Sequence, residues 1–416
     1  MQPTTVAVLW AGLTGCCTAL ELALRGHDVA LLDQDEQPLN RASLRNEGKI
    51  HLGMIYANEA TAATGHLQLH AALRFQRLLE RWVGVRARRI GVSTPFVYLV
   101  APGSLRDSDQ LEAFYRGIDA AYRAELEADP TLDYLGNRPA RLFQRLAADV
   151  AARHFAPGTW QAAFSTAERA VDTDDLAAHV RAAIDAAVRI RFMPRHVVCR
   201  ITRGDGRLLV EGTAGHEPFV LAARQVVNAT WERRLVLDRT IGLPASAGVL
   251  YRLKYRVVAR LPASLRGAPS VTMVLGRYGD VVVRSNDTVY LSWYPAGLQG
   301  WSDCIEPPRE WDGACRGEPP AEVAARVAAD TIAAIARWMP ALADAEPIRV
   351  DAGAIVAHGH TDVDDPASGL HGRTHVGVVS ADGYHSVDPG KLTTAPLFGL
   401  EVADRVDRDL RAGARA

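Results

Sequence analysis

The first part of the chain alternates between short apolar runs and turns marked by glycine. Apolar residues fill 6–9 and 29–32, and a stretch of mostly small residues lies between them at 16–25. Short apolar runs bounded by turns are typical of strands buried on both faces, whereas the longer stretch has the length of a helix. The pattern therefore predicts a strand–helix–strand unit, with the acidic residue Asp33 directly after its second strand.

Longer helices and more strands follow. Apolar side chains recur at helical spacing in 64–82 and 108–128, which are predicted as helices. Acidic residues at 172–175 mark the start of another helix that runs to 189, because negative charge is favourable in a first helical turn. Further strands are predicted at 92–100, 190–192, 197–201, 208–210, 219–221 and 225–228.

The pattern changes near residue 243. Apolar and polar residues then alternate in several segments, which is typical of antiparallel strands with one exposed face. A polar loop at 304–320 precedes an alanine-rich helix at 321–339, and the chain ends in a helix at about 393–410. The alternating segments are 251–261, 271–275, 281–284 and 289–294.

This order of elements predicts a mixed α/β fold (α/β with α+β character) made of two interleaved parts. A Rossmann-like nucleotide-binding domain is assigned to 1–89, 161–240 and 346–416, because strand–helix texture occurs in all three. An antiparallel-sheet domain, expected to bind the substrate, is assigned to 90–160 and 241–345. We therefore expect one discontinuous cofactor domain and one substrate domain.

Composition excludes several classes of protein. The net charge of −1 gives no reason to expect a nucleic-acid partner. The chain has no uncharged apolar run of membrane-spanning length and no basic segment before its first apolar run, so we expect no membrane span, no signal peptide and a cytoplasmic location. Five cysteines without a Cys-x-x-Cys pair argue against a disulfide framework and a zinc site. No metal is expected, because no common zinc spacing is matched by His358, His360, His371 and His375.

The turn after the first strand carries the first candidate site. Gly12 would let a pyrophosphate approach the main chain at the helix start, and Gly15 would let the helix pack closely on the sheet. Asp33 would accept hydrogen bonds from ribose hydroxyls. One position departs from this fingerprint, because Trp10 stands where the pattern has its first glycine. The alternative interpretation is a plain strand–helix–strand unit without a ligand.

Two further motifs lie at 42–56 and 383–396. The first reads Ala-Ser at 42–43, followed by Asn46-x-Gly-x-Ile-His-x-Gly-x-Ile-Tyr56, and the second reads Gly-Tyr-His-Ser-Val-Asp-Pro-Gly-Lys-Leu-Thr-Thr-Ala-Pro. Together with 6–33, and in this order, they resemble the flavin-dependent oxidoreductases of the D-amino acid oxidase superfamily, of the glycine and sarcosine oxidase type. The first motif is also similar to that of the 2-hydroxyglutarate and glycerol-3-phosphate dehydrogenase branch.

The resemblance implies a bound FAD that extends across the first domain. Gly12 and Gly15 would lie at its pyrophosphate, Asp33 at its adenosine ribose, and Val197 where the family makes main-chain contacts to adenine. Asn46 would either bond the flavin or close its own loop. The residues expected on the phosphate and flavin side are Ala42, Ser43, Asn46 and Gly48, and those expected at the pyrimidine end of the flavin are Gly390, Lys391, Leu392 and Thr393.

His51 is the main catalytic candidate that the resemblance implies. Its imidazole would take a proton from a substrate O–H or N–H as hydride goes to flavin N5. Two other interpretations stay open: His51 only shapes the pocket through main-chain hydrogen bonds, or it is linked covalently to the flavin, as in some relatives. Lys391 would either stabilise negative charge on the reduced flavin or be a solvated lysine at a helix start.

Substrate contacts are expected from the antiparallel sheet. The family uses arginine or tyrosine there to hold a carboxylate, and a bidentate arginine suits that group. We therefore select Arg277 and Tyr294 from this sheet, together with Tyr56 and His385 from the two motifs. The other candidates on or near these strands are Arg252, Lys254, Arg284 and Tyr290.

The sequence thus predicts an FAD-dependent oxidase or dehydrogenase. It would oxidise a C–N or C–O bond of a small amine, amino acid or hydroxy acid by hydride transfer, and oxygen or another acceptor would reoxidise the flavin. One alternative is a degenerate flavoprotein fold with weak or lost FAD that acts as a non-redox enzyme or a binding protein. Another is a tailoring enzyme for a larger biosynthetic substrate, with 304–320 as a lid.

Overall fold

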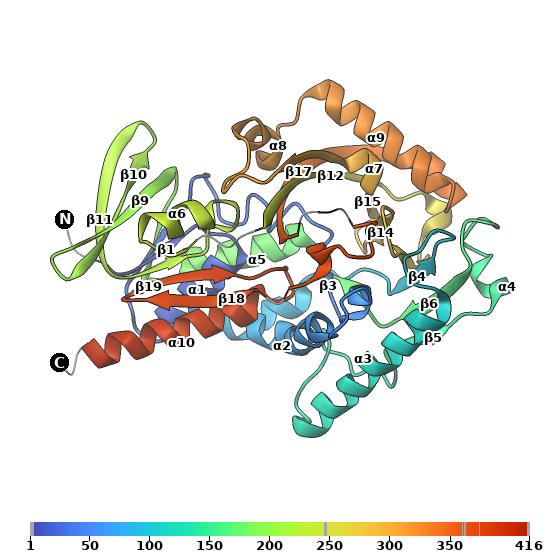
Figure 1. Cartoon of the computed structure of the whole chain (residues 1–416), viewed down its shortest axis with the longest axis horizontal. Helices are drawn as coiled ribbons and strands as arrows, with labels where there is room; N and C mark the ends of the chain where they lie inside the picture. Colours follow the sequence, from blue (N-terminus) through green and yellow to red (C-terminus); the bar gives the residue numbers. More distant parts are fainter. Residues whose placement is uncertain (1–3, 245–247, 360, 362, 374, 414–416) are drawn as a thin grey trace.

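Two large β-sheets lie side by side in this protein (Figure 1). The structure is a computed structural model of the whole chain and describes residues 4–244, 248–359, 361, 363–373 and 375–413. One sheet is built around parallel strands and the other is mainly antiparallel. The mixed α/β fold class predicted from the sequence is therefore confirmed.

The first sheet has a parallel centre of buried apolar strands. Its strands are β1 (Thr4–Leu9), β2 (Val29–Leu32), β8 (Ile190–Met193), β9 (His196–Gly204), β10 (Arg207–Ala214), β11 (Glu217–Asn228), β18 (Gly377–Ala381) and β19 (Tyr384–Asp388). The order is β18-β19-β11-β1-β2-β8, with β10 paired to β11 and β9 to β10. Because β1 pairs in parallel with both β2 and β11, the carboxyl ends of these three strands meet at one edge.

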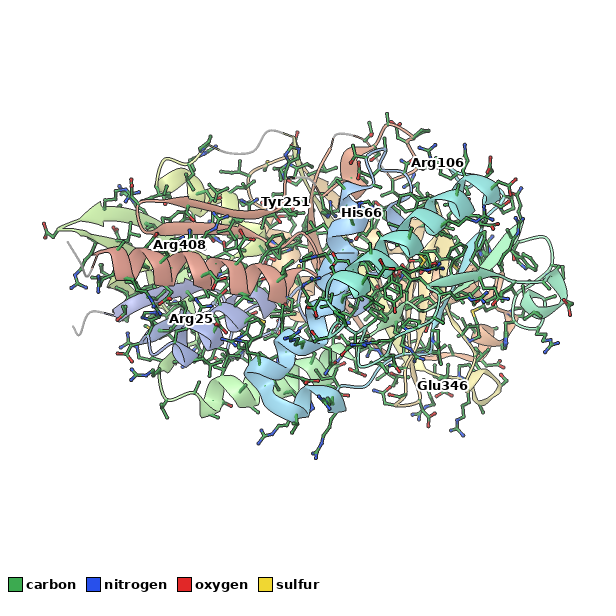
Figure 2. All side chains as sticks on the ribbon, turned by 90° about the horizontal axis from the view of Figure 1, so that it is seen from below. Arg25, His66, Arg106, Tyr251, Glu346 and Arg408 are labelled. Carbon is green, nitrogen blue, oxygen red and sulfur yellow. The ribbon has the colours of Figure 1, made fainter. Side chains whose placement is uncertain are left out.

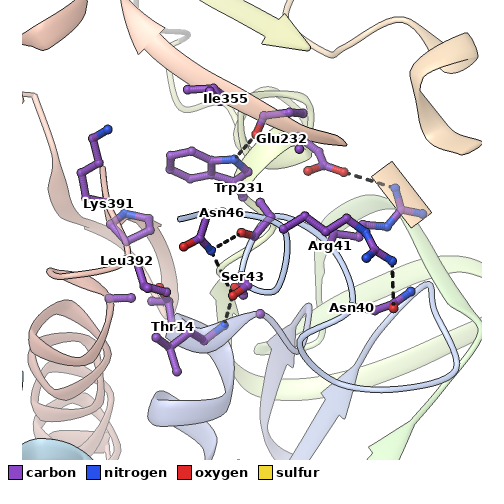
Figure 3. A pocket seen from close by; sticks show the side chains of 18 of the residues that line it. Thr14, Asn40, Arg41, Ser43, Asn46, Trp231, Glu232, Ile355, Lys391 and Leu392 are labelled. Carbon is purple, nitrogen blue, oxygen red and sulfur yellow. Dashed lines mark hydrogen bonds and ion pairs between the residues drawn. The ribbon is translucent and has the colours of Figure 1, made fainter. Parts of the chain in front are cut away.

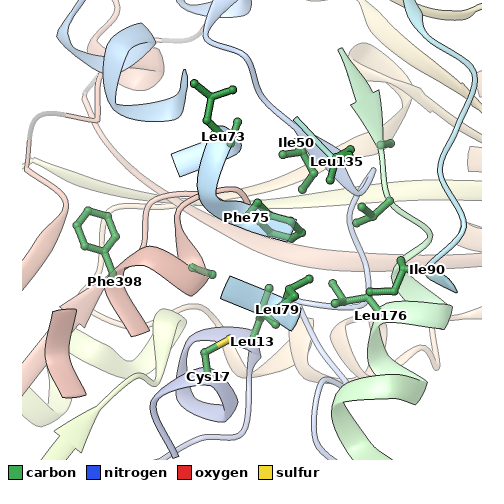
Figure 4. Close-up of a cluster of buried hydrophobic side chains, with 14 of the residues drawn as sticks. Leu13, Cys17, Ile50, Leu73, Phe75, Leu79, Ile90, Leu135, Leu176 and Phe398 are labelled. Carbon is green, nitrogen blue, oxygen red and sulfur yellow. The ribbon is translucent and has the colours of Figure 1, made fainter. Parts of the chain in front are cut away.

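A group of packed helices covers one face of this sheet. Its helices are α1 (Leu13–Leu24), α2 (Ala63–Val83), α5 (Thr173–Ala186) and α10 (Ala395–Gly413). Each contributes an apolar side chain to one buried cluster, as Leu13, Phe75, Leu176 and Phe398 show in Figure 4. Burial of this cluster fixes the position of the α1 start, which matters for the site described below.

The second sheet carries the other core. Its strands are β4 (Phe96–Val100), β5 (Phe143–Arg145), β6 (Ala162–Thr166), β12 (Val249–Arg260), β13 (Ser270–Val274), β14 (Gly279–Val283), β15 (Thr288–Trp293), β16 (Leu298–Ser302) and β17 (Glu346–His358). Neighbouring strands are antiparallel except for the parallel pair β4 and β13. Helix α9 (Ala321–Ala336) covers β12 and β17 and buries Val327 and Ile335 against them (Figure 1).

Shorter elements complete the chain. A two-stranded sheet joins β3 (Lys49–Ile50) to β7 (Arg169–Ala170). The remaining helices are α3 (Ser108–Ala128), α4 (Ala148–Ala151), α6 (Arg234–Thr240), α7 (Tyr294–Gly297) and α8 (Asp312–Arg316), with 3₁₀ turns η1 (Met54–Tyr56), η2 (Gly84–Arg89), η3 (Trp231–Arg233), η4 (Ala263–Leu265), η5 (Arg309–Trp311), η6 (Pro340–Asp344) and η7 (Gly369–His371).

The two sheets occupy opposite ends of the molecule. Figure 2 places Arg25 and Arg408 at the end that carries α1 and α10, and Arg106 and Glu346 at the other end. Two segments that the sequence assigned to the cofactor domain, 161–166 and 346–358, supply β6 and β17 to the second sheet. The division into a cofactor and a substrate domain stays a prediction, and its boundaries at 161 and 346 do not follow the sheets.

Most predicted elements correspond to observed ones. The segments 64–82 and 108–128 form α2 and α3, and the segment that begins with acids at 172–175 forms α5. The polar segment 304–320 is not all loop, because it contains η5 and α8. Within the described ranges, no helix is both long and apolar enough to cross a membrane.

Candidate active site

The main cavity lies where the carboxyl ends of the parallel strands face the second sheet. Trp10, Asp33 and Ala229, which directly follow β1, β2 and β11, line it from one side. Lys254 of β12 and Ala354 of β17 line it from the other. The edge at the carboxyl ends of parallel strands is where α/β folds bind ligands. In Figure 3, Lys391 and Leu392 approach the cavity from one side and Asn40 and Arg41 from the opposite side.

The start of α1 opens into this cavity. Gly12, Leu13 and Thr14 line it, and no acidic side chain lies in the first turn of this described helix. A Cβ on Gly15 would lie 2.0 Å from the main-chain oxygen of Trp10, so only glycine permits this packing. A Cβ on Gly12 would lie 3.3 Å from Ser43 Oγ, which accepts a hydrogen bond from Leu13 N at 2.9 Å. The helix start can therefore receive an anion such as a phosphate.

Trp10 occupies the glycine position of the motif without closing the cavity. Its φ of 71° lies in the left-handed region that glycine favours. The residue is buried at 7% exposure and lines the cavity. Because Gly12 lines the same cavity, space remains beside the helix start.

The Asp33 carboxylate joins two strand ends. Its Oδ2 accepts a hydrogen bond from Ala11 N at 2.6 Å and its Oδ1 accepts one from Asp35 N at 2.8 Å. Burial raises the pKa of Asp33 to about 7, against the opposing effect of these hydrogen bonds. The side chain also lines the cavity, so a ribose contact stays possible and remains a prediction.

The loop 42–48 is held by its own side chains. Asn46 Nδ2 donates to Ala42 O at 2.8 Å and to Ser43 O at 3.1 Å, and Asn46 Oδ1 accepts from Gly48 N at 2.7 Å. Asn46 therefore closes its loop, which was one of its two predicted roles. Ala42, Ser43 and Asn46 line the cavity, whereas Gly48 supports them from outside the lining.

Some of the residues predicted at the two ends of the cofactor line the cavity, and others do not. Gly390, Lys391 and Leu392 line the cavity. Thr393 lies behind them, fully buried, and its Oγ1 accepts a hydrogen bond from His51 N at 2.9 Å. Val197 lies on β9 and does not line the cavity. The first residue of β9 does contact a lining residue, because His196 N donates a hydrogen bond to Asp33 O at 2.8 Å.

His51 lines the cavity as a buried imidazole. Its exposure is 5%, and its ring lies edge-on to Tyr56 with centroids 5.5 Å apart. Burial, followed by the charges of Lys391 and Lys49, holds the pKa of His51 well below its usual value. The imidazole is therefore neutral near pH 7 and has a nitrogen lone pair that can accept a proton.

Glu168 is one of the site residues that the sequence did not single out, together with Glu47 of the cavity lining. It is fully buried, and its Oε1 accepts a hydrogen bond from Tyr98 OH at 2.5 Å while its Oε2 accepts one from Leu52 N at 2.7 Å. Burial raises the pKa of Glu168, although Lys49 opposes the shift. The segment around it, 166–172, reads Thr-Ala-Glu-Arg-Ala-Val-Asp and is weakly similar to the flavin-dependent oxidoreductases named in the sequence analysis. This similarity is the signal in the sequence that could have pointed to Glu168.

The predicted substrate residues lie outside the cavity lining. Tyr56 is buried behind His51. Tyr294 OH accepts a hydrogen bond from Arg252 Nη1 at 2.7 Å. Arg277 is 46% exposed and lies 3.9 Å from Asp364.

His385 requires a correction. It is fully buried in β19, and both of its ring nitrogens already have partners, Gln225 Oε1 at 2.7 Å and Ser380 Oγ at 2.9 Å. Neither nitrogen is therefore free for a substrate. The motif predicted a substrate contact, but the alternation of β19 turns this side chain toward Gln225 of β11 and Ser380 of β18 instead.

In the described part of the chain, no group of three or more His, Cys, Asp or Glu residues is arranged to hold a metal ion. His360, one of the histidines considered above, lies outside the described residues.

The family described as FAD dependent oxidoreductase matches residues 5–405. A comparison with curated proteins finds no match.

Solved structures share the fold at low sequence identity. Glycine oxidase from Geobacillus kaustophilus is 19% identical, with a TM-score of 0.71 over 98% of this chain and 95% of that one. NikD, an amino acid oxidase essential for nikkomycin biosynthesis, is 16% identical, with a TM-score of 0.65 over 98% and 95%. L-α-glycerophosphate oxidase from Mycoplasma pneumoniae, solved with FAD bound, is 16% identical, with a TM-score of 0.63 over 98% and 95%.

Proposed function

Because the chain belongs to the family of FAD-dependent oxidoreductases, we propose that it oxidises the C–N or C–O bond of a small amino acid, amine or hydroxy acid. The observation that carries this proposal is the position of His51. This buried imidazole lines the same cavity as the open start of α1 and Lys391. A base, an anion-binding turn and a cation thus face one space.

The described residues fit FAD. The helix start at Gly12 is a cradle that a larger residue would narrow, because a Cβ there meets Ser43 Oγ at 3.3 Å. We assign the pyrophosphate to this helix start and the adenosine ribose to Asp33. Main-chain groups of Gly390 and Leu392 are assigned to the pyrimidine end of the flavin.

When bound, FAD supplies a ring that takes up two electrons from the substrate and gains negative charge near its N1. Lys391 stabilises that charge from the loop that precedes α10, because a cation lowers the energy of a nearby anion most where water is excluded. Burial, followed by Arg373, lowers the pKa of Lys391 to about 7. A nearby anion raises the pKa of a cation again and so keeps it protonated.

His51 takes the substrate proton in this mechanism. Glu168 Oε1 lies 3.8 Å from His51 Nδ1, and a carboxylate on that side favours the tautomer with hydrogen on Nδ1. The lone pair then resides on Nε2, which accepts the proton from the substrate O–H or N–H. Glu168 acts through His51 and is a positioning residue.

The alternatives from the sequence receive less support. A fold that has lost FAD would not require an open cavity beside Gly12. A wide, lid-covered pocket for a large substrate is not favoured either, because segment 304–320 is bound to the loop that carries Arg41 and Arg45. Arg41 Nη1 binds Asp312 Oδ1 at 2.7 Å, and Arg45 Nε donates to Cys315 O at 2.7 Å.

The test is anaerobic reduction of the FAD-loaded protein by a panel of amino acids, amines and hydroxy acids. We expect the flavin absorbance to bleach with at least one member, and the class of that member decides between C–N and C–O oxidation. A protein that binds no flavin when FAD is added would overturn the proposal. So would bound flavin that no member of the panel bleaches.

A further inference from the structure

The lysines of this protein gather at one cavity. Only three of its 47 lysine and arginine residues are lysines, and these three, Lys49, Lys254 and Lys391, all line the cavity described above. An ammonium group is a compact charge that responds to its surroundings, whereas arginine stays charged and serves surface pairs equally well. The placement of the lysines therefore marks a region where positive charge has a specific task.

Two basic residues in this region have acidic partners within the protein. Lys49 Nζ lies 2.8 Å from Asp280 Oδ1. Arg256 forms a two-point pair with Asp351, with Nε to Oδ1 at 2.5 Å and Nη2 to Oδ2 at 3.1 Å. Asp351 also lies 3.2 Å from Arg45 Nη1 and 3.3 Å from Arg349 Nε, so its single charge is shared. Because Lys49 and Arg256 each have an acidic partner within the protein, they are left out of the charge count below.

Four other basic residues form no ion pair with any acid that the structure describes: Arg252, Lys254, Arg373 and Lys391. Arg252 and Arg373 are only 4% and 5% exposed, and the Nε of each has no hydrogen-bond partner among the described residues. Arg252 Nη1 donates to the neutral Tyr294 OH at 2.7 Å, and Lys254 Nζ lies 5.9 Å from the centre of the same ring. Buried cations with neutral partners are costly unless an anion joins them.

The four cations belong to one cluster, named here the cationic cluster (Arg252, Lys254, Arg373 and Lys391). Arg252, Lys254 and Arg256 are every second residue of β12, so their side chains lie on the same face of the strand. Lys254 and Arg256 line the cavity. Arg373 lies beside the loop that carries Lys391, because a Cβ on Gly390 would meet Arg373 Cδ at 3.2 Å. The other three cations all act on the pKa of Lys391.

The balance of charges in the cationic cluster indicates how many negative charges its ligand carries. Glu47 is the carboxylate among the groups that act on Lys391, and Glu47 also lines the cavity. Asp388 opposes the lowering of the pKa of Arg373 by burial, but its Oδ2 already accepts a hydrogen bond from Arg234 Nη2 at 3.0 Å. One of the three remaining positive charges serves the negative charge that develops on bound FAD. Two positive charges are left for the substrate.

We infer that the substrate carries two negative charges, as a dicarboxylic or phosphorylated amino or hydroxy acid does, and that the cationic cluster binds them. This inference rests on the proposed function for the reaction but concerns a binding site that can be measured without turnover. Arg252 and Lys254 lie on β12, whereas Arg373 and Lys391 lie before β18 and after β19. Because the cations come from separate parts of the chain, two separated carboxylates and a single phosphate are both tested below.

The first experiment titrates the FAD-loaded, oxidised protein with anions that cannot be oxidised. Succinate and butyrate have equal carbon counts but differ by one charge, and methyl phosphate tests the phosphate form. Perturbation of the flavin spectrum gives each dissociation constant. We expect succinate or methyl phosphate to bind at least about tenfold more tightly than butyrate, since each added charge meets unpaired cations. Equal affinities for all three would overturn the inference.

Variants then locate the effect. Lys254→Gln and Arg252→Gln should each weaken binding of the tighter dianion about tenfold and that of butyrate by no more than about twofold. Arg260→Gln is the matched control, because Arg260 lies on the same strand but is 71% exposed and faces Glu346. If Arg252→Gln does not fold, the half-buried Lys254 still decides the question. An equal loss in Arg260→Gln would contradict a local site.

A second measurement separates this inference from the proposed function. An amine-acetylating reagent followed by mass spectrometry reports on the three lysines individually. Succinate should slow modification of Lys254 and Lys391 but not of the N-terminal amine. Protection without any flavin reduction would sink the proposed oxidation and keep the anion site. Flavin reduction by a singly charged substrate, without protection by succinate or methyl phosphate, would sink the anion site and keep the oxidation.

Discussion

The Nδ1 atom of His51 lies 3.8 Å from Oε1 of Glu168, and among the described residues it has no hydrogen-bond partner. The Nε2 atom on the other side of the ring lies 3.9 Å from Oε1 of Glu47, which lines the cavity. The imidazole is therefore placed between a fully buried carboxyl group and the space assigned to flavin and substrate. The two carboxyl groups differ in role, because only Glu168 lies outside the cavity.

Glu168→Gln should change the pH dependence of flavin reduction. Burial raises the pKa of Glu168, so this carboxyl stays protonated to higher pH than an ordinary glutamate. As pH rises and the group ionises, it favours hydrogen on His51 Nδ1, so the wild-type rate should rise. His51 stays neutral over this range because its own pKa is lowered. Rapid-mixing reduction at several pH values should show this rise in the wild type only, at equal FAD content.

Identical pH profiles for wild type and Glu168→Gln would contradict a positioning role. The amide keeps an oxygen that can accept from Leu52 N, so the variant tests charge rather than the loss of that hydrogen bond.

Anion binding should weaken as pH rises through about 7. The pKa of Lys391 is lowered to about 7 by burial and then by Arg373, so in the free site the ammonium is charged below this pH and neutral above it. The affinity for succinate should therefore fall across this range in the wild type. In Lys391→Gln the affinity should be lower and should not fall there, since arginines stay protonated. A wild-type affinity that is flat between pH 6 and pH 8, roughly one unit on each side of that pKa, would contradict the assignment.

Gly15→Ala should impair FAD binding. The added Cβ would lie 2.0 Å from the main-chain oxygen of Trp10, so the helix start must move away from the strand. We expect FAD affinity to fall at least about tenfold, because the N–H groups of the helix start lose their alignment. Gly117→Ala is the control: nothing lies within 4 Å of its Cβ in α3, and it should stabilise the protein by about 0.5–1 kcal/mol without changing FAD affinity. Normal FAD affinity in Gly15→Ala would contradict the location of the pyrophosphate.

Trp10→Gly should be more stable than Trp10→Ala. Both variants lose the buried indole, but the main chain at this position has a φ of 71°, which glycine adopts without strain. The free energy of unfolding should favour the glycine variant by about 1 kcal/mol, measured as a higher thermal midpoint in the absence of FAD. If alanine is equally stable, the left-handed conformation of Trp10 is not what distinguishes this turn.

The sequence predicted those parts of the site that depend on local pattern. Gly12, the acid at the end of β2 and the loop before α10 all reach the cavity, because strand–turn–helix geometry is set by neighbouring residues. Gly15 lies outside the lining and packs the helix against the strand. His51 and Lys391 also reach the cavity, although only the family resemblance connected two positions so far apart in the chain.

What the sequence did not predict depends on pairing between distant segments. Glu168 meets His51 because β7 pairs with β3, and periodicity carries no sign of that pairing. Arg252 and Lys254 were two of several candidates on the second sheet, and only the placement of β12 beside the first sheet shows that Lys254 lines the cavity. His385 was misassigned for the same reason, since its motif does not reveal which face of β19 it occupies.

We propose above that His51 accepts the substrate proton while bound FAD is reduced. The direct measurement is the rate of anaerobic flavin reduction in wild type and His51→Asn, with equal FAD occupancy and with the substrate that bleaches the wild type. We predict that the variant is slower by about 100- to 10,000-fold at saturating substrate, the range expected for loss of a general base. An unchanged rate in His51→Asn would contradict the account.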